Sequence, residues 1–282
     1  MPLSPAVAHA LASTMLSPAD LERIESVHFH DAGHGYDPFG LHPSFVAMSA
    51  GWVRPFYERY FRVLSYGQEN VPTQGPAILA ANHSGNVPID GMMLWMDLLS
   101  RPDAPRVLRA VADHFVPSLP WIGTMFARCG VVGGSRGNAR TLLESGELLL
   151  IFPEGTPAIL KPWAQRYQLY EFRQGFAELA IRHRAPVVPV GVVGAEEQLP
   201  QLALIKALGK PFGIPGMPIP AVPFPLPVRY HLRYGAPLRF DQEYSVADAD
   251  DPAVVKEAAA RVQEAVAALL AEGLKARKGV FA

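Results

Sequence analysis

Short apolar runs that alternate with amphipathic helical patterns constrain the fold of this chain more than any other feature. Apolar runs typical of buried strands cover residues 77–81, 107–111, 148–152, 187–193 and 228–234. Helical patterns cover residues 90–99, 120–128, 138–145 and 173–183. Strands that alternate with helices need crossover connections, so the pattern predicts an α/β fold with a mostly parallel central sheet flanked by helices.

The two ends of the chain add further helices. Residues 1–66 are predicted to be an N-terminal helical segment, and residues 67–282 the α/β domain, which closes with an amphipathic helix over 252–275. Residues 44–64 combine apolar and aromatic side chains at helical spacing with Arg54, Arg59 and Arg62. This helix either packs on the core or lies in a membrane interface, and Pro55 interrupts its apolar face.

Charge and cysteine content exclude several classes of protein. The chain has 282 residues, with 25 basic against 26 acidic side chains and a formal charge of -1. That balance argues against a nucleic-acid partner, which favours a basic excess. The single Cys129 excludes an internal disulfide and a multi-cysteine zinc site.

Hydropathy points to a membrane surface rather than to a membrane span. The mean hydropathy is +0.11, yet no uncharged helical run reaches the roughly 18 apolar residues that cross a bilayer. The N-terminus lacks the basic start of a secretory signal. We therefore expect a cytoplasmic protein that associates peripherally with a membrane.

A proline-rich apolar arm covers residues 199–228. It has no acidic residue, and Lys206 and Lys210 are its cations. Its prolines exclude a regular helix in the second half and any central strand. The arm is either buried across the domain or in contact with lipid.

A candidate base and its orienting acid follow the first predicted strand. His83 comes directly after residues 77–81, and Asp90 begins the next helix. Ligand-binding groups of α/β folds stand at the carboxyl ends of strands. His83 could exchange a proton while Asp90 fixes its ring, although the same residues could simply hydrogen-bond a turn and cap a helix.

A second candidate acid follows the apolar run at 148–152. Glu154 lies in a turn directly after this buried strand. A carboxylate so close to apolar surroundings needs a partner. Glu154 is either part of a site or a turn acid that accepts backbone hydrogen bonds.

Taken together, these motifs resemble the glycerolipid acyltransferase family, whose best-known members acylate lysophosphatidic acid. Asn82-His83 with downstream Asp90 is similar to the family's first motif, and the five residues 152–156 match its FPEGT block. Residues 130–136, ending in Arg136, resemble the second block, and residues 187–190 the fourth. The resemblance extends from about residue 67 to residue 240.

The chain departs from the family pattern at two positions. Six residues separate His83 from Asp90 where the family has four, so residues 85–88 must form a wider turn. Pro157 stands where the family has an arginine after FPEGT. Either Lys161 or Arg166 could supply that cation, or the acceptor carries no phosphate.

The resemblance implies an O-acyltransferase in which His83 is the general base and Asp90 orients it. The acyl donor would be an acyl-CoA or acyl-carrier-protein thioester, the acceptor a lysolipid or other glycerolipid hydroxyl, and no cofactor would be tightly bound. The residues implied in substrate binding are Arg136, Glu154, Gly155, Thr156 and Lys161. Arg136, ahead of a helix, could hold an anion or be a solvated turn residue.

Two other interpretations of the sequence remain open, and a third is disfavoured. Residues 133–137 satisfy the G-x-S-x-G pattern of serine hydrolases, with Ser135 as nucleophile and His183 or His231 downstream. The proline-rich arm and the 44–64 helix would suffice for a lipid-binding module without catalysis. A metal site in the loop that contains His28, His30, Asp31, His34 and His42 is disfavoured, because these residues lack ligand spacing.

Overall fold

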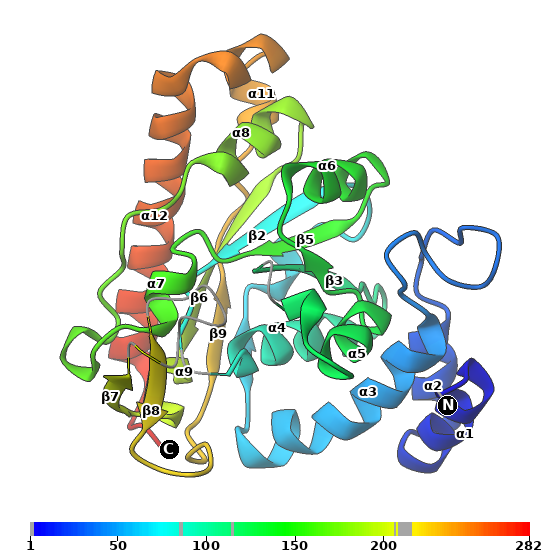
Figure 1. Ribbon diagram of the computed structural model, residues 1–282. Helices are drawn as coiled ribbons and strands as arrows, with labels where there is room; N and C mark the ends of the chain where they lie inside the picture. The colour runs from blue at the N-terminus through cyan, green and yellow to red at the C-terminus, as the bar shows by residue number, and fades with distance from the viewer. Residues whose placement is uncertain (1–2, 85–86, 114–115, 206, 208–215) are drawn as a thin grey trace.

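A mostly parallel seven-stranded sheet forms the centre of the molecule. The structure, a computed structural model, describes residues 3–84, 87–113, 116–205, 207 and 216–282. Within these residues the strand order is β1-β9-β6-β2-β5-β3-β4 (Figure 1). The strands are β1 (Leu64–Tyr66), β2 (Ala77–Ala81), β3 (Leu108–Ala112), β4 (Val132–Gly133), β5 (Leu148–Ile151), β6 (Val187–Val193) and β9 (His231–Tyr234). Within this sheet the pair β6–β9 is antiparallel and the other described pairs are parallel, which confirms the predicted fold class.

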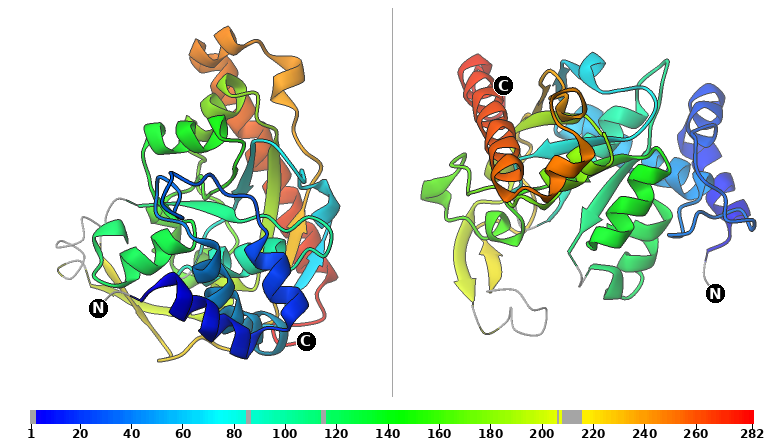
Figure 2. Two further views of the ribbon diagram at one scale, coloured as in Figure 1. Left: turned by 90° about the vertical axis from the view of Figure 1, so that its right-hand side faces the viewer. Right: turned by 90° about the horizontal axis from the view of Figure 1, so that it is seen from above.

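Helices cover both faces of this sheet. One layer consists of α1 (Pro5–Met15), α2 (Pro18–Glu25), α3 (Pro43–Pro55), α4 (Ile89–Leu99) and α5 (Ile122–Arg128). The other consists of α6 (Arg136–Glu144), α8 (Gly175–Arg182) and α12 (Pro252–Ala276). Short helices α7 (Thr156–Ile159), α9 (Ala195–Gln198) and α11 (Phe240–Glu243) connect them. Figure 2 shows the N-terminal helices and α12 on opposite sides of the molecule.

The central strands are apolar along their whole length because both of their faces are covered. Every residue of β2 and β6 is buried. Ile78 and Ala80 of β2 pack toward α6, α8 and α12, while Leu79 and Ala81 pack toward α3 and α4. This is the behaviour of a parallel sheet between two helical layers, and it explains the continuous apolar runs.

The 44–64 segment differs from the single helix that its pattern suggests. Helix α3 ends at Pro55 and continues as one π-helical turn, Phe56–Tyr60, before Leu64 begins strand β1. Proline inside the last turn disrupts regular α-helical bonding. Phe45 and Val46 are buried, whereas Trp52 and Phe56 remain 63% and 51% exposed. The segment thus packs one face on the core and keeps aromatic side chains at the surface.

The proline-rich arm contains a separate two-stranded antiparallel sheet. Its strands are β7 (Gln201–Ile205) and β8 (Met217–Pro220); residues 206 and 208–215 lie outside the described part of the chain. Both strands are edges, which is where prolines are tolerated. Leu202 and Phe224 are 73% and 77% exposed, so the arm presents apolar side chains to the surroundings.

The last predicted strand is shorter than its apolar run. Val228 and Tyr230 are buried, but their backbone N–H groups donate to Leu226 and Phe61 rather than to a sheet partner. Strand β9 therefore begins at His231. The apolar run predicted correctly that this stretch is buried. It could not predict the residue at which strand pairing begins, because burial and strand pairing are separate properties.

Candidate active site

The carboxyl ends of β2, β5 and β6 bring together His83, Asp90 and Glu154 among the predicted site residues. Asn82, directly after β2, is buried, and its carboxamide bonds both backbone groups of Val192 in β6, at 3.0 Å and 2.7 Å. These two bonds join residues 110 positions apart. They fix the chain at the point where His83 begins to leave the sheet.

His83 and Asp90 form the predicted pair across their six-residue spacing. The imidazole Nδ1 lies 2.7 Å from Asp90 Oδ2. The same carboxylate accepts the backbone N–H groups of Ser84 at 3.0 Å and Gly91 at 2.8 Å, and it is fully buried. The His83 ring also stacks on Phe152, with ring centres 4.0 Å apart. Gly85 and Asn86 of the intervening turn lie outside the described residues.

This arrangement sets which imidazole nitrogen is available for chemistry. A carboxylate accepts a hydrogen bond, so Asp90 favours the tautomer of His83 with the proton on Nδ1. The lone pair then lies on Nε2. The His83 side chain is 16% exposed, so this ring is accessible while its partner is not. The pair has the geometry of a base and its orienting acid.

Glu154 connects the FPEGT turn to the main chain of His83. Its Oε1 accepts the backbone N–H of His83 at 3.2 Å, and its Oε2 accepts that of Tyr170 at 2.8 Å. Lys161 Nζ lies 3.4 Å from Oε2. The Glu154 side chain has no exposed surface. In this structure the Glu154 carboxylate therefore bonds to the backbone of two separate segments and to Lys161.

Lys161 lies in a buried ion-pair network and not at the surface. Its ammonium is 3.4 Å from both Glu154 and Glu196. Burial raises the pKa of Glu196 to about 7, against the lowering effect of Lys161 and of the hydrogen bond from the Tyr167 backbone. The positive charge of Lys161 is therefore already compensated. Arg166 is exposed, with its guanidinium 4.8 Å from the centre of the Trp163 ring.

Gly155 and Thr156 shape the turn after Glu154. Gly155 has φ 67° and ψ −164°, a conformation essentially restricted to glycine. The guanidinium of Arg173 packs on it so closely that a Cβ at Gly155 would lie 2.7 Å from Arg173 Cζ. Thr156 Oγ1 donates to Asp113 at 2.5 Å. Arg173 is thus an exposed cation beside the FPEGT turn, although the sequence analysis did not select it.

Arg136 and Ser135 lie at the start of α6, after β4. The Arg136 side chain is 77% exposed, and its guanidinium is 3.5 Å from Glu178. Ser135 Oγ accepts the backbone N–H of Asn138 at 3.0 Å as the N-cap of α6. Within the described chain no hydrogen bond joins Ser135 to His183 or His231. The serine hydrolase interpretation therefore lacks its base.

The histidine-containing N-terminal loop forms ordinary turn and cap contacts. Asp31 Oδ1 accepts three backbone N–H groups, those of residues 33, 34 and 35. His42 Nδ1 accepts the backbone N–H of Ser44 at the start of α3. In the described parts of the chain, no three His, Cys, Asp or Glu side chains are arranged to hold a metal ion.

The structure adds two residues near His83 that sequence reasoning missed. Glu196 comes shortly after the buried strand β6, just as Glu154 comes shortly after β5. The signal that selected Glu154, an acid directly after a buried strand, therefore also applies to Glu196. Gln201 begins β7 and lies near Glu196 in the wall of one pocket. No sequence signal singles out Gln201, because its neighbours come from distant parts of the chain.

The chain is similar in sequence to known proteins. Residues 62–193 match the family model described as acyltransferase. An uncharacterized protein of Mycobacterium tuberculosis is 37% identical over 258 residues, which are 88% of this chain and 72% of the relative. A Bos taurus protein named DGAT1/2-independent enzyme synthesizing storage lipids is 28% identical over 208 residues, 73% of this chain and 58% of that protein.

The fold also matches a solved structure. The 1-acyl-sn-glycerophosphate acyltransferase PlsC from Thermotoga maritima superposes with a TM-score of 0.53 and 19% identity, covering 83% of each chain. At that identity the match shows a shared fold. With the family model and the relative of 37% identity, the conclusion is that this chain belongs to the acyltransferase family.

Proposed function

We propose that the protein transfers a fatty acyl group from a thioester to a hydroxyl of a glycerolipid, with His83 as general base and Asp90 as its orienting acid. The observation that carries this proposal is the 2.7 Å contact between His83 Nδ1 and the buried Asp90 carboxylate. Glu154 supports it by holding the His83 main chain from the FPEGT turn. The donor is an acyl-CoA or an acyl carrier protein thioester.

The reaction needs no covalent acyl-enzyme. His83 Nε2 takes the proton of the acceptor hydroxyl as its oxygen attacks the thioester carbonyl carbon. The tetrahedral intermediate then collapses, the C–S bond breaks, and the thiolate leaves with the proton from His83. An ester and a free thiol are the products, and the imidazole returns to its neutral form.

Two exposed arginines suit substrates that carry phosphate. Arg136 and Arg173 are both exposed, and both lie toward the first turn of α8, where Glu178 contacts Arg136. We assign them to anionic groups of the donor or acceptor, while Lys161 serves to hold Glu154 in place. Thr156 and Gly155 shape the turn that presents these groups.

The purified protein should release free thiol from an acyl thioester in an acceptor-dependent way, with a matching amount of ester product. Long-chain acyl-CoA and acyl carrier protein thioesters should be tested separately, each with lysophosphatidate, other lysolipids, monoacylglycerol and diacylglycerol. Thiol release that yields free fatty acid without ester would contradict the proposal. Stoichiometric labelling of Ser135 by a fluorophosphonate would instead support a hydrolase.

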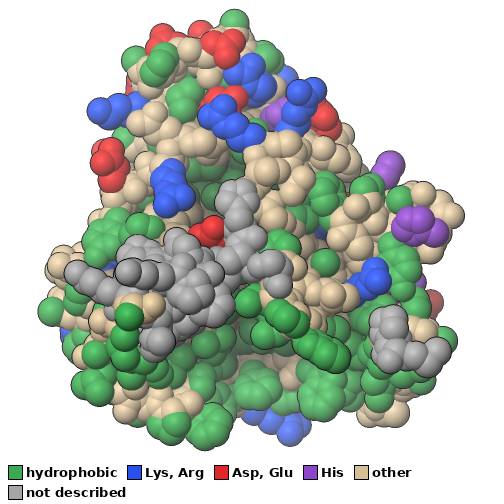
Figure 3. All heavy atoms as spheres, viewed as in Figure 1, with side chains coloured by type: hydrophobic (Ala, Val, Ile, Leu, Met, Phe, Trp, Pro, Cys, Tyr) green, Lys and Arg blue, Asp and Glu red, His purple; other side chains and the backbone are tan. Residues whose placement is uncertain are grey.

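We also propose that the protein works while bound peripherally to a membrane. No helix in the described residues has the length and apolar character to cross a bilayer. Hydrophobic side chains gather over the lower part of the face shown in Figure 3, in the region of α3, α5 and β7–β8. Trp52, Trp121, Ile122, Leu202 and Phe224, all at least half exposed, come from these parts of the chain. Tryptophan side chains favour the interface of a bilayer.

The double variant Trp121→Ser/Phe224→Ser should float with phospholipid vesicles several-fold less than the unaltered protein. Trp121 is 84% exposed and Phe224 77%, so their removal takes apolar area from the lipid contact without opening the core. Val246→Ser is the matched control, because Val246 is also exposed but precedes α12 at the other end of the molecule. Equal flotation of all three proteins would contradict the proposed surface.

A further inference from the structure

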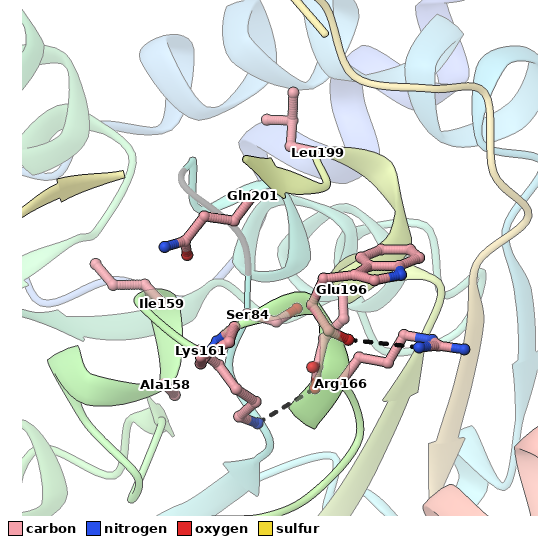
Figure 4. A pocket seen from close by; sticks show the side chains of 10 residues that line it. Ser84, Ala158, Ile159, Lys161, Arg166, Glu196, Leu199 and Gln201 are labelled. Carbon is pink, nitrogen blue, oxygen red and sulfur yellow. Dashed lines mark hydrogen bonds and ion pairs between the residues drawn. The ribbon is translucent and has the colours of Figure 1, made fainter. Parts of the chain in front are cut away.

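A small polar pocket opens one residue beyond His83 and is not explained by the roles assigned so far (Figure 4). Its free volume is only about 20 Å³, and it is partly open to solvent. Ser84 after β2, Lys161 after α7, Glu196 in α9 and Gln201 at the start of β7 contribute polar side chains to its wall. Four separate parts of the chain therefore converge on one space next to the proposed base.

Two polar atoms in this wall are buried without a partner among the described residues. They are the Ser84 hydroxyl oxygen and the Gln201 carboxamide oxygen. Ser84 as a whole is 2% exposed, while its backbone N–H is fixed by Asp90. Buried polar atoms are almost always hydrogen-bonded, because an unsatisfied one costs about 1–3 kcal/mol. The pocket therefore offers two polar atoms whose hydrogen-bonding capacity a ligand could use.

The buried charges in the wall pair with one another, while Arg166, the other cation of the wall, is exposed and lies over the Trp163 ring. The Lys161 ammonium is shared by Glu154 and Glu196, at 3.4 Å from each, so it presents no uncompensated positive charge to an anion. The Gln201 oxygen and the Glu196 carboxylate accept hydrogen bonds, and the Ser84 hydroxyl can accept or donate. A hydroxyl group fits this set, since it donates to one oxygen and accepts from another.

The rest of the lining fits a lipid that carries such a hydroxyl. Ile159 and Leu199 add apolar side chains to the same pocket, beside the polar set. In Figure 4 Leu199 lies above Gln201, farthest from the Lys161–Glu196 ion pair, and Ile159 lies to the left, above Ala158. A glycerol unit with an attached acyl chain has this combination of hydroxyl and hydrocarbon.

We propose that this pocket binds a second, non-reacting hydroxyl of the acceptor, so that the enzyme prefers glycerolipids with two free hydroxyls. The inference rests on the proposed function, in which His83 activates the other hydroxyl. Ser84 and Gln201 are then residues that determine acceptor specificity.

The test compares monoacylglycerol, which has two free hydroxyls, with an acyl propanediol that has one. The unaltered enzyme should favour the diol in kcat/KM by about tenfold or more, as expected for two additional hydrogen bonds. The double variant Ser84→Ala/Gln201→Leu should lose that preference. Arg140→Ala, an exposed arginine on α6, should keep it. Unfolding midpoints should show that the variant is folded.

Binding separates failure of this inference from failure of the proposed function. Calorimetric titration with monoacylglycerol and the propanediol analogue, in the His83→Ala background, should show the same preference without turnover. Absence of turnover in the unaltered enzyme, with the binding preference intact, would overturn the proposed reaction and leave the pocket assignment standing. Equal binding of both lipids, or a preference that survives Ser84→Ala/Gln201→Leu, would mean that the pocket holds solvent alone and would overturn the inference.

Discussion

The variant His83→Ala is expected to lower kcat for acyl transfer by about 10²–10⁴-fold, the usual contribution of a positioned general base. The imidazole makes one side-chain hydrogen bond, to Asp90, and stacks on Phe152, so its removal takes away the base and little of the core. Thiol release and ester formation should both be measured at saturating donor and acceptor. Circular dichroism should confirm that the fold is retained.

Two further variants make this experiment decisive. Asp90→Asn should also reduce kcat strongly, because an amide can donate to Nδ1 and stabilise the wrong tautomer of His83. His9→Ala is the matched control, since His9 is an exposed histidine paired with Glu25 in the N-terminal helices. Undiminished turnover in His83→Ala would refute the assignment. Lipid transfer that persists in that variant, with no acyl transfer in the unaltered protein, would support a lipid-binding module.

Replacing Arg109 with alanine should destabilise the fold by about 3–5 kcal/mol, the range for breaking a buried ion pair. Arg109 in β3 is 1% exposed and contacts Asp37 at 2.6 Å, Glu147 at 3.4 Å and the Gly130 carbonyl at 3.0 Å. Its loss leaves two carboxylates buried without their cation. Burial already raises the pKa of Glu147, and Arg109 opposes that shift. Urea unfolding at neutral pH measures the loss.

The position of the N-terminal loop depends on the same arginine. Asp37 Oδ1 accepts the backbone N–H groups of Phe39 and Leu41, so Arg109 connects this loop to the sheet through Asp37.

The control variant is Arg140→Ala, which removes an exposed ion pair with Glu144 and should change the free energy of unfolding by less than about 0.5 kcal/mol. A loss for Arg109→Ala no larger than that of Arg140→Ala would show that the buried network contributes nothing.

Sequence patterns were most informative where structure is set locally. The runs at 77–81 and 187–193 coincide with β2 and β6, because strands buried on both faces must be apolar throughout. The helices α4, α5, α6, α8 and α12 begin and end within two residues of their predicted bounds. The 44–64 segment was less well predicted, since Pro55 leads into a π-helical turn and a strand that helical periodicity does not reveal.

The sequence by itself determined the α/β architecture, the positions of His83 and Glu154 after buried strands, and that of Asp90 at the start of a helix. The tertiary structure decided what these residues contact. His83 and Glu154 are 71 positions apart, and they meet because β2 and β5 are neighbours in the sheet. Strand order is a property of the whole fold, so local periodicity carries no information on it. For the same reason, only the tertiary structure shows that Lys161 is buried and that a pocket lies beside Ser84.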